Sequence, residues 1–218
     1  MPYCAVILLL VLAYLLGSIP SAVWISRRYF GVDIRQLGSK NAGATNMLRV
    51  FGMRAALPVF AIDSLKGFVA VTAMGILRLY PEVTGSWIIS LKIFAVIVVV
   101  IGHIFPIFAS FKGGKGVSTL VGAITGIVPQ LALLCFAVWV AIFVFTHYVS
   151  LASMVAGISF PIFVSLFSVM HYYQDGQISW LFIVFSVAVA VLLVWTHRAN
   201  ISRLRSGTEP KTYMWEKK

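Results

Sequence analysis

The sequence predicts an all-α integral membrane protein with seven transmembrane helices, and two observations lead to that prediction. Of the 218 residues, 61% are hydrophobic and only 11% are charged, whereas a soluble domain is about half apolar and about a quarter charged. Apolar runs of about 20 residues, the length that crosses a bilayer as a helix, recur along the chain. So few charges cannot cover a water-facing surface. This excludes a soluble enzyme, a nucleic-acid-binding module and a disordered protein.

The predicted spans form a single polytopic domain over residues 1–218. They cover residues 3–25, 55–77, 87–111, 117–128, 130–146, 151–171 and 178–196. The run at 117–128 is the shortest. Its 12 residues rise only about 18 Å as a helix, which is less than the hydrocarbon core of about 30 Å. A short tilted span and a re-entrant hairpin are the two interpretations of this run.

The distribution of cations favours the span. The chain has 17 Lys and Arg against six Asp and Glu, a formal net charge of +11. If 117–128 crosses, the cations of loop 27–54, of turn 112–116 and of the tail from residue 197 all lie on one side of the membrane. Positively charged loops mark the cytoplasmic side. The prediction is therefore seven spans with the N-terminus outside, on the periplasmic side, and the C-terminus in the cytoplasm.

Three polar segments on this predicted cytoplasmic side are candidate sites, and the first covers about residues 36–49. It combines small residues with hydroxyl, amide and cationic side chains. Its candidate ligand-binding residues are Ser39, Asn41, Gly43, Ala44, Thr45, Asn46 and Arg49. Glycine lets backbone N–H groups approach an anion, and hydroxyl and amide groups add donors, so the loop suits a phosphate group. A flexible polar loop between helices is the alternative.

The second segment covers about residues 102–119 and places two lysines among three glycines. Its candidate residues are His103, Lys112, Gly113, Gly114, Lys115 and Gly116. Such a compact cationic turn suits a phosphate. It is not a nucleotide-binding P-loop, because Ala109 stands where that motif requires its first glycine. The alternatives are an ordinary positively charged loop and a buried, structural His103.

The third segment covers about residues 196–209. If the last helix continues through it, His197, Asn200 and Arg203 share one face and present a proton acceptor, an amide and a cation. Arg198 and Glu209 add a further cation and a carboxylate. A basic helix lying on anionic lipid headgroups is the alternative, although it leaves the histidine and asparagine unexplained.

Other polar groups lie inside the apolar runs. Asp63 and Lys66 are spaced i, i+3 in the second run, which fits either an ion pair that locks helices or a substrate contact. Ser150 and Ser153 lie at the junction of the fifth and sixth runs, where helix capping alone explains a serine. The spacing of cysteine, histidine and carboxylate residues shows no metal-ligand cluster, so neither a metal nor a cofactor is expected.

Taken in order, the three segments resemble the acyl-phosphate:glycerol-3-phosphate acyltransferases, the PlsY family of bacterial integral-membrane enzymes. The segments that carry the resemblance are residues 38–46, 102–116 and 196–209, and shorter similar segments lie at 17–21, 63–67 and 150–153. The resemblance implies seven helices and a cytoplasmic-facing site. It also implies transfer of a fatty acyl group from acyl phosphate to the sn-1 hydroxyl of glycerol 3-phosphate. The products would be lysophosphatidic acid and phosphate, the first step of phospholipid synthesis.

The resemblance also implies roles for residues and partners. His197, Asn200 and Ser39 are the expected catalytic residues. The expected substrate-binding residues are Asn41, Gly43, Ala44, Thr45, Asn46, Arg49, Lys66, His103, Lys112, Gly113, Gly114, Lys115, Gly116, Ser150, Ser153, Arg198, Arg203 and Glu209. The expected partners are acyl phosphate, glycerol 3-phosphate and the lipid bilayer of a bacterial cytoplasmic (inner) membrane. The enzyme that forms the acyl phosphate is a further candidate partner, and no nucleic acid is expected.

A membrane transporter or flippase for a phosphorylated solute or lipid is the alternative function. Polar loops at one membrane face and an intramembrane Asp63–Lys66 pair would serve transport as well. The chain shows no internal repeat, however, whereas many transporters are built from repeats with a site at the membrane midplane. The sequence therefore favours the acyltransferase.

Overall fold

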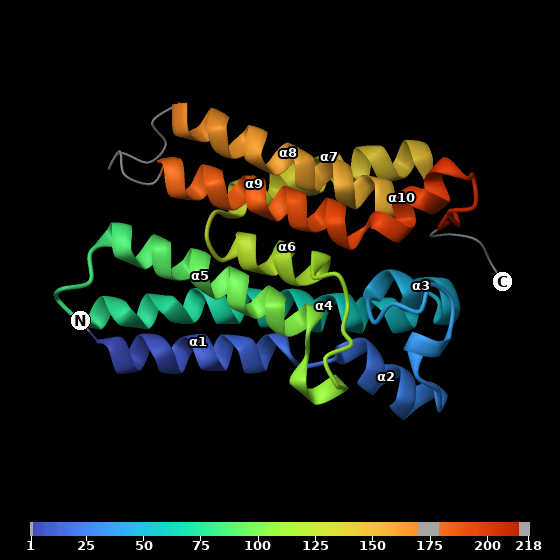
Figure 1. Ribbon diagram of the computed structural model, residues 1–218, viewed down its shortest axis with the longest axis horizontal. Helices are drawn as coiled ribbons and strands as arrows, with labels where there is room; N and C mark the ends of the chain where they lie inside the picture. Colours follow the sequence, from blue (N-terminus) through green and yellow to red (C-terminus); the bar gives the residue numbers. More distant parts are fainter. Residues whose placement is uncertain (1, 170–178, 214–218) are drawn as a thin grey trace. The chain divides into compact units, whose positions relative to one another are not determined.

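The computed structural model describes residues 2–169 and 179–213, and all the regular structure in these ranges is helical. The chain divides into two compact units, Met1–Pro129 and Gln130–Lys218. Figure 1 labels the helices of both units. Each unit contains long apolar helices together with some of the predicted site residues. The single domain expected over 1–218 stays a prediction.

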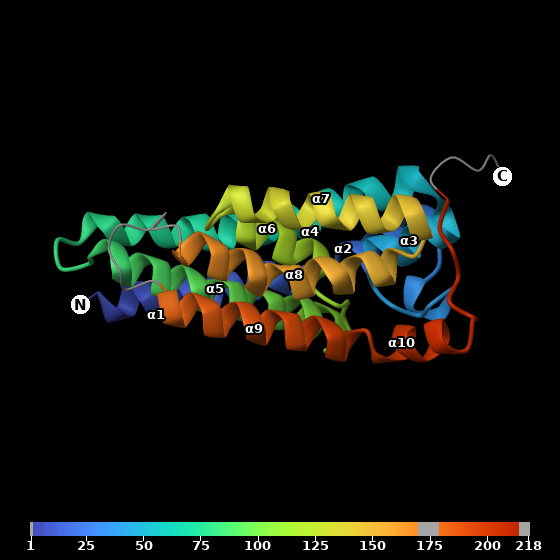
Figure 2. The same cartoon turned by 90° about the horizontal axis from the view of Figure 1, so that it is seen from above.

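The first unit contains six α-helices and three short 3-10 turns. They are α1 (Tyr3–Gly17), α2 (Ser21–Phe30), η1 (Ile34–Gln36), α3 (Ala44–Phe51), α4 (Met53–Thr72), η2 (Ala73–Leu79), α5 (Gly85–Ile104), η3 (Ile107–Ala109) and α6 (Val117–Thr125). The first predicted span is broken between α1 and α2 because Pro20 lacks a backbone donor. Helices α1, α4 and α5 contact one another and run lengthwise together in Figures 1 and 2.

Helix α6 packs against α4 through glycines. A side-chain carbon on Gly67 would meet the carbonyl oxygen of Thr119, and one on Gly122 would meet that of Ser64. Small residues allow helix backbones to approach this closely in membrane proteins. The contact holds the first turn of α6, including Thr119, against the polar middle of α4.

A small apolar core supports the first polar segment. Ile34, Met47 and Val59 are fully buried and pack with alanines of α2 and α4. Burial of each such side chain contributes roughly 1.5–3 kcal/mol. The segment between α2 and α3 is therefore a loop with a packed base.

The second unit contains α7 (Pro129–Thr146), α8 (Val149–Val169), α9 (Ser179–Thr196) and α10 (Arg198–Arg205). Phe160 on α8 meets the rings of Phe182 and Phe185 on α9 edge-on, with centroids 6.0 and 6.4 Å apart. The last two helices are bent by 57°. The chain then returns to the α7–α8 turn, where the Thr212 amide donates to the His147 carbonyl at 2.9 Å.

Within the described residues, five segments are long and apolar enough to cross a membrane. They are Tyr3–Phe30, Met53–Leu79, Trp87–Ala109, Pro129–Thr146 and Val149–Ser168, and the bent pair Trp180–Thr196 and Arg198–Arg205 makes a sixth if it counts as one span. Helix α6 has nine residues and is about 14 Å long at 1.5 Å per residue. The all-helical membrane fold is confirmed, whereas seven spans and their orientation stay predictions. The predicted span ends at 171 and 178 lie outside the described residues.

Candidate functional site

The first polar segment folds around Asn46, which is 1% exposed. Its Nδ2 group donates to the carbonyl oxygens of Ile34, Leu37 and Asn41 at 3.2, 3.0 and 3.0 Å. Its Oδ1 atom accepts from the Ser39 backbone N–H at 2.9 Å. Asn46 therefore shapes the loop that presents Ser39 and Asn41. Its expected contact with substrate stays a prediction.

The rest of this segment leads into α3. Gly43 precedes the helix, Ala44 and Thr45 form its first turn, and Arg49 lies one turn further, partly buried. Backbone N–H groups and a partial positive charge gather at a helix N-terminus. This end of α3 therefore fits the predicted phosphate chemistry.

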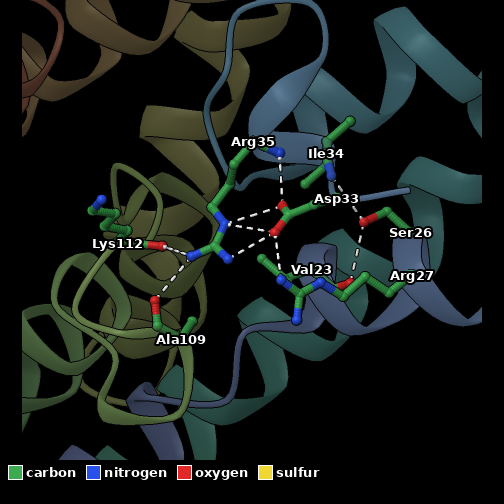
Figure 3. Close-up of polar contacts among 8 residues, drawn as sticks. All are labelled: Val23, Ser26, Arg27, Asp33, Ile34, Arg35, Ala109 and Lys112. Carbon is green, nitrogen blue, oxygen red and sulfur yellow. Dashed lines mark hydrogen bonds and ion pairs between the residues drawn. The ribbon is translucent and has the colours of Figure 1, made fainter. Parts of the chain in front are cut away.

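At the base of the same loop, Asp33 and Arg35 form a dense ion pair (Figure 3). Arg35 Nη2 donates to Asp33 Oδ2 at 2.7 Å and Arg35 Nε donates to Asp33 Oδ1 at 3.0 Å. Arg27 Nη2 reaches Asp33 Oδ2 at 2.8 Å. The hydrogen bond from the Arg35 side chain is the largest cause that holds the pKa of Asp33 well below its usual range, and it outweighs the cost of burial.

The glycine turn of the second segment lies over the end of α5. The Gly113 N–H donates to the Ile104 carbonyl at 3.1 Å, and the Gly114 N–H donates to the His103 carbonyl at 3.2 Å. A side-chain carbon on Gly114 would meet the His103 ring. The N–H groups of these two glycines therefore hold the turn in place. The cationic part of the turn is the exposed Lys112 with the partly buried Lys115.

A buried polar cluster in the same unit is centred on Asp63. Lys66 Nζ lies 2.7 Å from Asp63 Oδ1, with the two side chains 3% and 1% exposed. Ser21 Oγ donates to the same oxygen at 2.8 Å. His103 Nδ1 lies 3.0 Å from Thr119 Oγ1 and 3.8 Å from Asp63 Oδ1. The ion pair that the i, i+3 spacing allowed is present, and His103 lies beside it as a buried ring that is hydrogen-bonded to Thr119.

This cluster borders a small pocket. The polar and glycine residues that line it are Ser21, Asp63, Lys66, His103, Gly113 and Gly114. Lys66 is also held by the backbone, since Nζ donates to the Ile19 carbonyl at 2.9 Å. The predicted residues Lys66, His103, Gly113 and Gly114 are thus brought together around one pocket.

In the second unit, Glu209 gathers three predicted residues. Its Oε1 atom accepts from Ser150 Oγ at 2.8 Å and from Asn200 Nδ2 at 2.7 Å, and its Oε2 atom accepts from Arg203 Nε at 2.7 Å. Burial would raise the pKa of Glu209, but the hydrogen bonds from Asn200, Arg203 and Ser150 outweigh it and lower this pKa. Glu209 is therefore an anionic anchor for α8 and α10.

His197 occupies the bend between α9 and α10 and is 3% exposed. Its Nδ1 atom lies 2.7 Å from the Leu193 carbonyl oxygen. A carbonyl oxygen only accepts, so Nδ1 of the neutral ring carries the proton and Nε2 carries the lone pair. This tautomer suits a proton acceptor whose ring is held by the backbone of α9.

Two other predicted residues of this unit have neighbours of their own. The Arg198 guanidinium lies over the Trp195 ring, 4.7 Å from its centroid. Ser153 Oγ donates to the Val149 carbonyl at 2.8 Å and accepts from Trp139 Nε1 at 3.2 Å. These contacts give each side chain a structural role, and a substrate contact for either stays a prediction.

Comparison with known proteins identifies the family. A family model described as glycerol-3-phosphate acyltransferase matches residues 7–207. The chain belongs to this family. A glycerol-3-phosphate acyltransferase of Chlorobaculum tepidum is 38% identical over 219 residues, covering 92% of this chain and 94% of the relative.

Two solved structures of a family member are similar as well. Both are crystal structures of PlsY, described as an integral membrane glycerol 3-phosphate acyltransferase, and both are 35% identical with a TM-score of 0.76. The glycerol 3-phosphate form covers 94% of each chain, and the lysophosphatidic acid form covers 96% of each. The resemblance inferred from the three polar segments is confirmed.

For this member of the glycerol-3-phosphate acyltransferase family, the structure adds polar residues that sequence analysis did not select. They are Ser21 and Thr119 beside the Asp63 cluster and Arg35 at the base of the first loop. Arg35 stands two residues after one of only six carboxylates, which is a signal of pairing. Serine and threonine are too common in the sequence for Ser21 or Thr119 to be recognised as partners of the buried cluster.

No group of three His, Cys, Asp or Glu side chains able to hold a metal ion occurs within the described ranges. Cys135 lies on α7 and Cys4 on α1, and both are free thiols. The carboxylates that gather polar residues, Asp33, Asp63 and Glu209, are each engaged with an arginine or a lysine.

Proposed function

We propose that the chain transfers a fatty acyl group from acyl phosphate to the sn-1 hydroxyl of glycerol 3-phosphate at a bacterial cytoplasmic membrane. Lysophosphatidic acid and inorganic phosphate are the products. One observation carries the proposal: a relative matched over 94% of both chains has been solved in a glycerol 3-phosphate form and in a lysophosphatidic acid form. These two ligands differ by one acyl group, so they are the acceptor and the product of a single transfer.

Acyl phosphate supports this chemistry because it is a mixed anhydride with a good leaving group. The glycerol oxygen attacks the acyl carbon and forms an ester bond. The bond from that carbon to the phosphate oxygen breaks, and its electron pair leaves with phosphate. The hydroxyl proton passes to a base on the protein or to the departing phosphate. Orientation and charge neutralisation supply the catalysis, without a covalent enzyme intermediate.

In the second unit we assign the proton to His197 and the orientation of the hydroxyl to Asn200. His197 has its Nδ1 atom on a backbone carbonyl, so Nε2 is the basic atom. Asn200 donates to Glu209 through Nδ2, which fixes the orientation of its amide. Arg203 is held by the same carboxylate and supplies a cation for a phosphate group.

In the first unit we assign phosphate binding to both polar loops. Lys112 and Lys115 provide the cations of the glycine turn, and Arg49 provides one on α3. Ser39 is presented by the loop that Asn46 shapes and contributes a hydroxyl donor. The acyl chain of the donor fits the apolar, membrane-spanning part of the molecule rather than these loops.

The test is a donor and acceptor assay with purified protein in detergent. Palmitoyl phosphate and glycerol 3-phosphate are supplied, with palmitoyl thioesters as parallel donors, and phosphate and lysophosphatidic acid are measured. We expect phosphate release that depends on glycerol 3-phosphate, equal formation of lysophosphatidic acid, and no reaction of the thioesters.

The proposal would be overturned if the purified protein formed no product from any donor although its cooperative thermal unfolding showed that it was folded. Flux of glycerol 3-phosphate into sealed vesicles that contain such a protein would then support the transporter instead. Product formed equally well from a thioester would retain the acyl transfer but contradict the acyl phosphate donor.

A further inference from the structure

We propose that Arg35 is a positioning residue that fixes the Lys112 turn against the base of the first polar loop and thereby sets the affinity for glycerol 3-phosphate. The inference rests on the proposed function, because it concerns how the two phosphate-binding loops are held together. Arg35 does not touch substrate in this proposal. It acts through the backbone of the turn that carries Lys112.

The guanidinium of Arg35 divides its donors between two parts of the chain (Figure 3). Nε and Nη2 bind the Asp33 carboxylate, with the shortest contact at 2.7 Å. Nη1 donates to the carbonyl oxygens of Ala109 and Lys112 at 2.9 and 3.1 Å. One side chain therefore joins the first loop to a turn more than 70 residues further along the chain.

The turn that Arg35 binds has a backbone that needs support. Ser110 and Phe111 have φ angles of 55° and 58°. This left-handed conformation is disfavoured for residues other than glycine, and here two such residues follow each other. The carbonyls that accept from Arg35 belong to Ala109 and Lys112, which flank this pair on either side. Arg35 is thus placed to hold the turn in its disfavoured conformation and to fix the backbone position of Lys112.

The other end of this connection is anchored in the core. Ile34 is fully buried, and its backbone N–H donates to Ser26 Oγ at 3.1 Å. Ser26 is itself buried on α2 and donates to the Val23 carbonyl at 3.1 Å. Arg35 therefore extends from a rigid base, and the turn is held to that base and not merely to another loop.

Arginine is the residue that this connection requires. Its planar guanidinium presents five donors in a fixed fork, whereas lysine presents three donors at a single point. Arg35→Lys keeps the charge beside Asp33 but cannot also reach both carbonyls. Arg27→Lys is a matched control, because Arg27 donates to the same carboxylate from α2 and its side chain is 60% exposed.

The experiment compares steady-state kinetics of the wild type, Arg35→Lys and Arg27→Lys with palmitoyl phosphate and glycerol 3-phosphate. We expect Arg35→Lys to raise the KM for glycerol 3-phosphate about tenfold, with kcat changed less than about threefold, because hydrogen bonds that position a binding loop are lost. Arg27→Lys should retain the wild-type KM. The midpoints of thermal unfolding should match in the two variants.

The outcomes of this comparison distinguish failure of the proposed function from failure of the role of Arg35. A wild type without activity rejects the proposed function. An active wild type with an unchanged KM in Arg35→Lys rejects only the role of Arg35. A lower unfolding midpoint for Arg35→Lys than for Arg27→Lys also rejects it, because the residue would then serve general stability.

Ser110→Gly provides a second, independent readout. Glycine adopts the left-handed conformation without steric cost, so it relieves the turn of the need for support. Ser110→Gly alone should leave the KM unchanged, whereas in the Arg35→Lys background it should lower the raised KM at least about threefold. No recovery in the double variant would contradict the claim that the shape of the turn links Arg35 to substrate affinity.

Discussion

Asp63 and Glu209 are both buried carboxylates that accept from several side chains, but the cations they hold differ in exposure. Lys66, beside Asp63, is 3% exposed, whereas Arg203, beside Glu209, is 34% exposed. The partners of Asp63, Ser21 and Lys66, lie on α2 and α4 of the first unit, and those of Glu209 lie on α8 and α10 of the second. The ion pair of the first unit is therefore closed to solvent and that of the second is partly exposed, and in the proposed function it is the second that presents its cation to a ligand.

Asp63→Asn should produce the largest loss of stability. It leaves the Lys66 ammonium buried without a counter-charge, and breaking a buried pair in this way costs about 3–5 kcal/mol. Thermal unfolding in detergent measures the effect, and Asp63→Asn/Lys66→Met is the control, since replacing both charges restores much of the loss. A midpoint equal to that of the wild type would show that Asp63 does not hold the first unit together.

Glu209→Gln should reduce activity more than stability. The amide has one accepting oxygen in place of two charged ones, so the hold on Asn200 and Arg203 is weakened by about 1.5–3 kcal/mol. We expect kcat/KM to fall at least about tenfold, with a smaller drop in unfolding midpoint than in Asp63→Asn. Ser150→Ala, which removes one neutral donor from the same carboxylate, should have a weaker effect. A large loss of stability with unchanged kcat/KM would reverse the comparison.

Of the three carboxylates, Asp33 should have the smallest effect when it is replaced, and the pH dependence of thermal unfolding measures its contribution to stability. Its pKa in the folded protein is held below the ordinary value by the hydrogen bonds from Arg35. The stabilisation is therefore full above the unfolded pKa of about 3.9 and is lost as pH falls through the lower folded pKa. The difference in unfolding midpoint between wild type and Asp33→Asn should be constant from pH 7 to about 5 and narrow below about pH 4. A gap that widens toward acid would contradict this sign.

Local patterns predict those parts of the fold that depend on neighbouring residues. The run predicted at 130–146 is α7, Pro129–Thr146, and the run predicted at 55–77 lies within the segment Met53–Leu79. The i, i+3 spacing of Asp63 and Lys66 anticipated a pair that the structure shows at 2.7 Å. The short length of α6 left two interpretations open, and its close packing on α4 could not be predicted because it pairs Gly122 with the backbone of a distant helix and Gly67 of that helix with the backbone of α6.

The contacts that organise the site join residues too far apart for such patterns. Ser150 and Glu209 are 59 residues apart, and Arg35 and Ala109 are 74 apart. The family resemblance placed Glu209 among the expected substrate-binding residues, and nothing in the sequence indicated that Ser150 and Asn200 would donate to it. The same reasoning could not show that the amide of Asn46 is occupied by its own loop. Residue type indicated the chemistry of the site, but only the fold shows which polar side chains hydrogen-bond to one another.

The proposed role of His197 is tested by the rate of lysophosphatidic acid formation in His197→Ala beside wild type, with palmitoyl phosphate and glycerol 3-phosphate. Ser202→Ala, an exposed position on α10, is the matched control. We expect His197→Ala to be slower by at least about 100-fold, the usual contribution of a positioned acid or base, while it still unfolds cooperatively, and we expect Ser202→Ala to keep the wild-type rate. A wild-type rate in His197→Ala would contradict the proposed role.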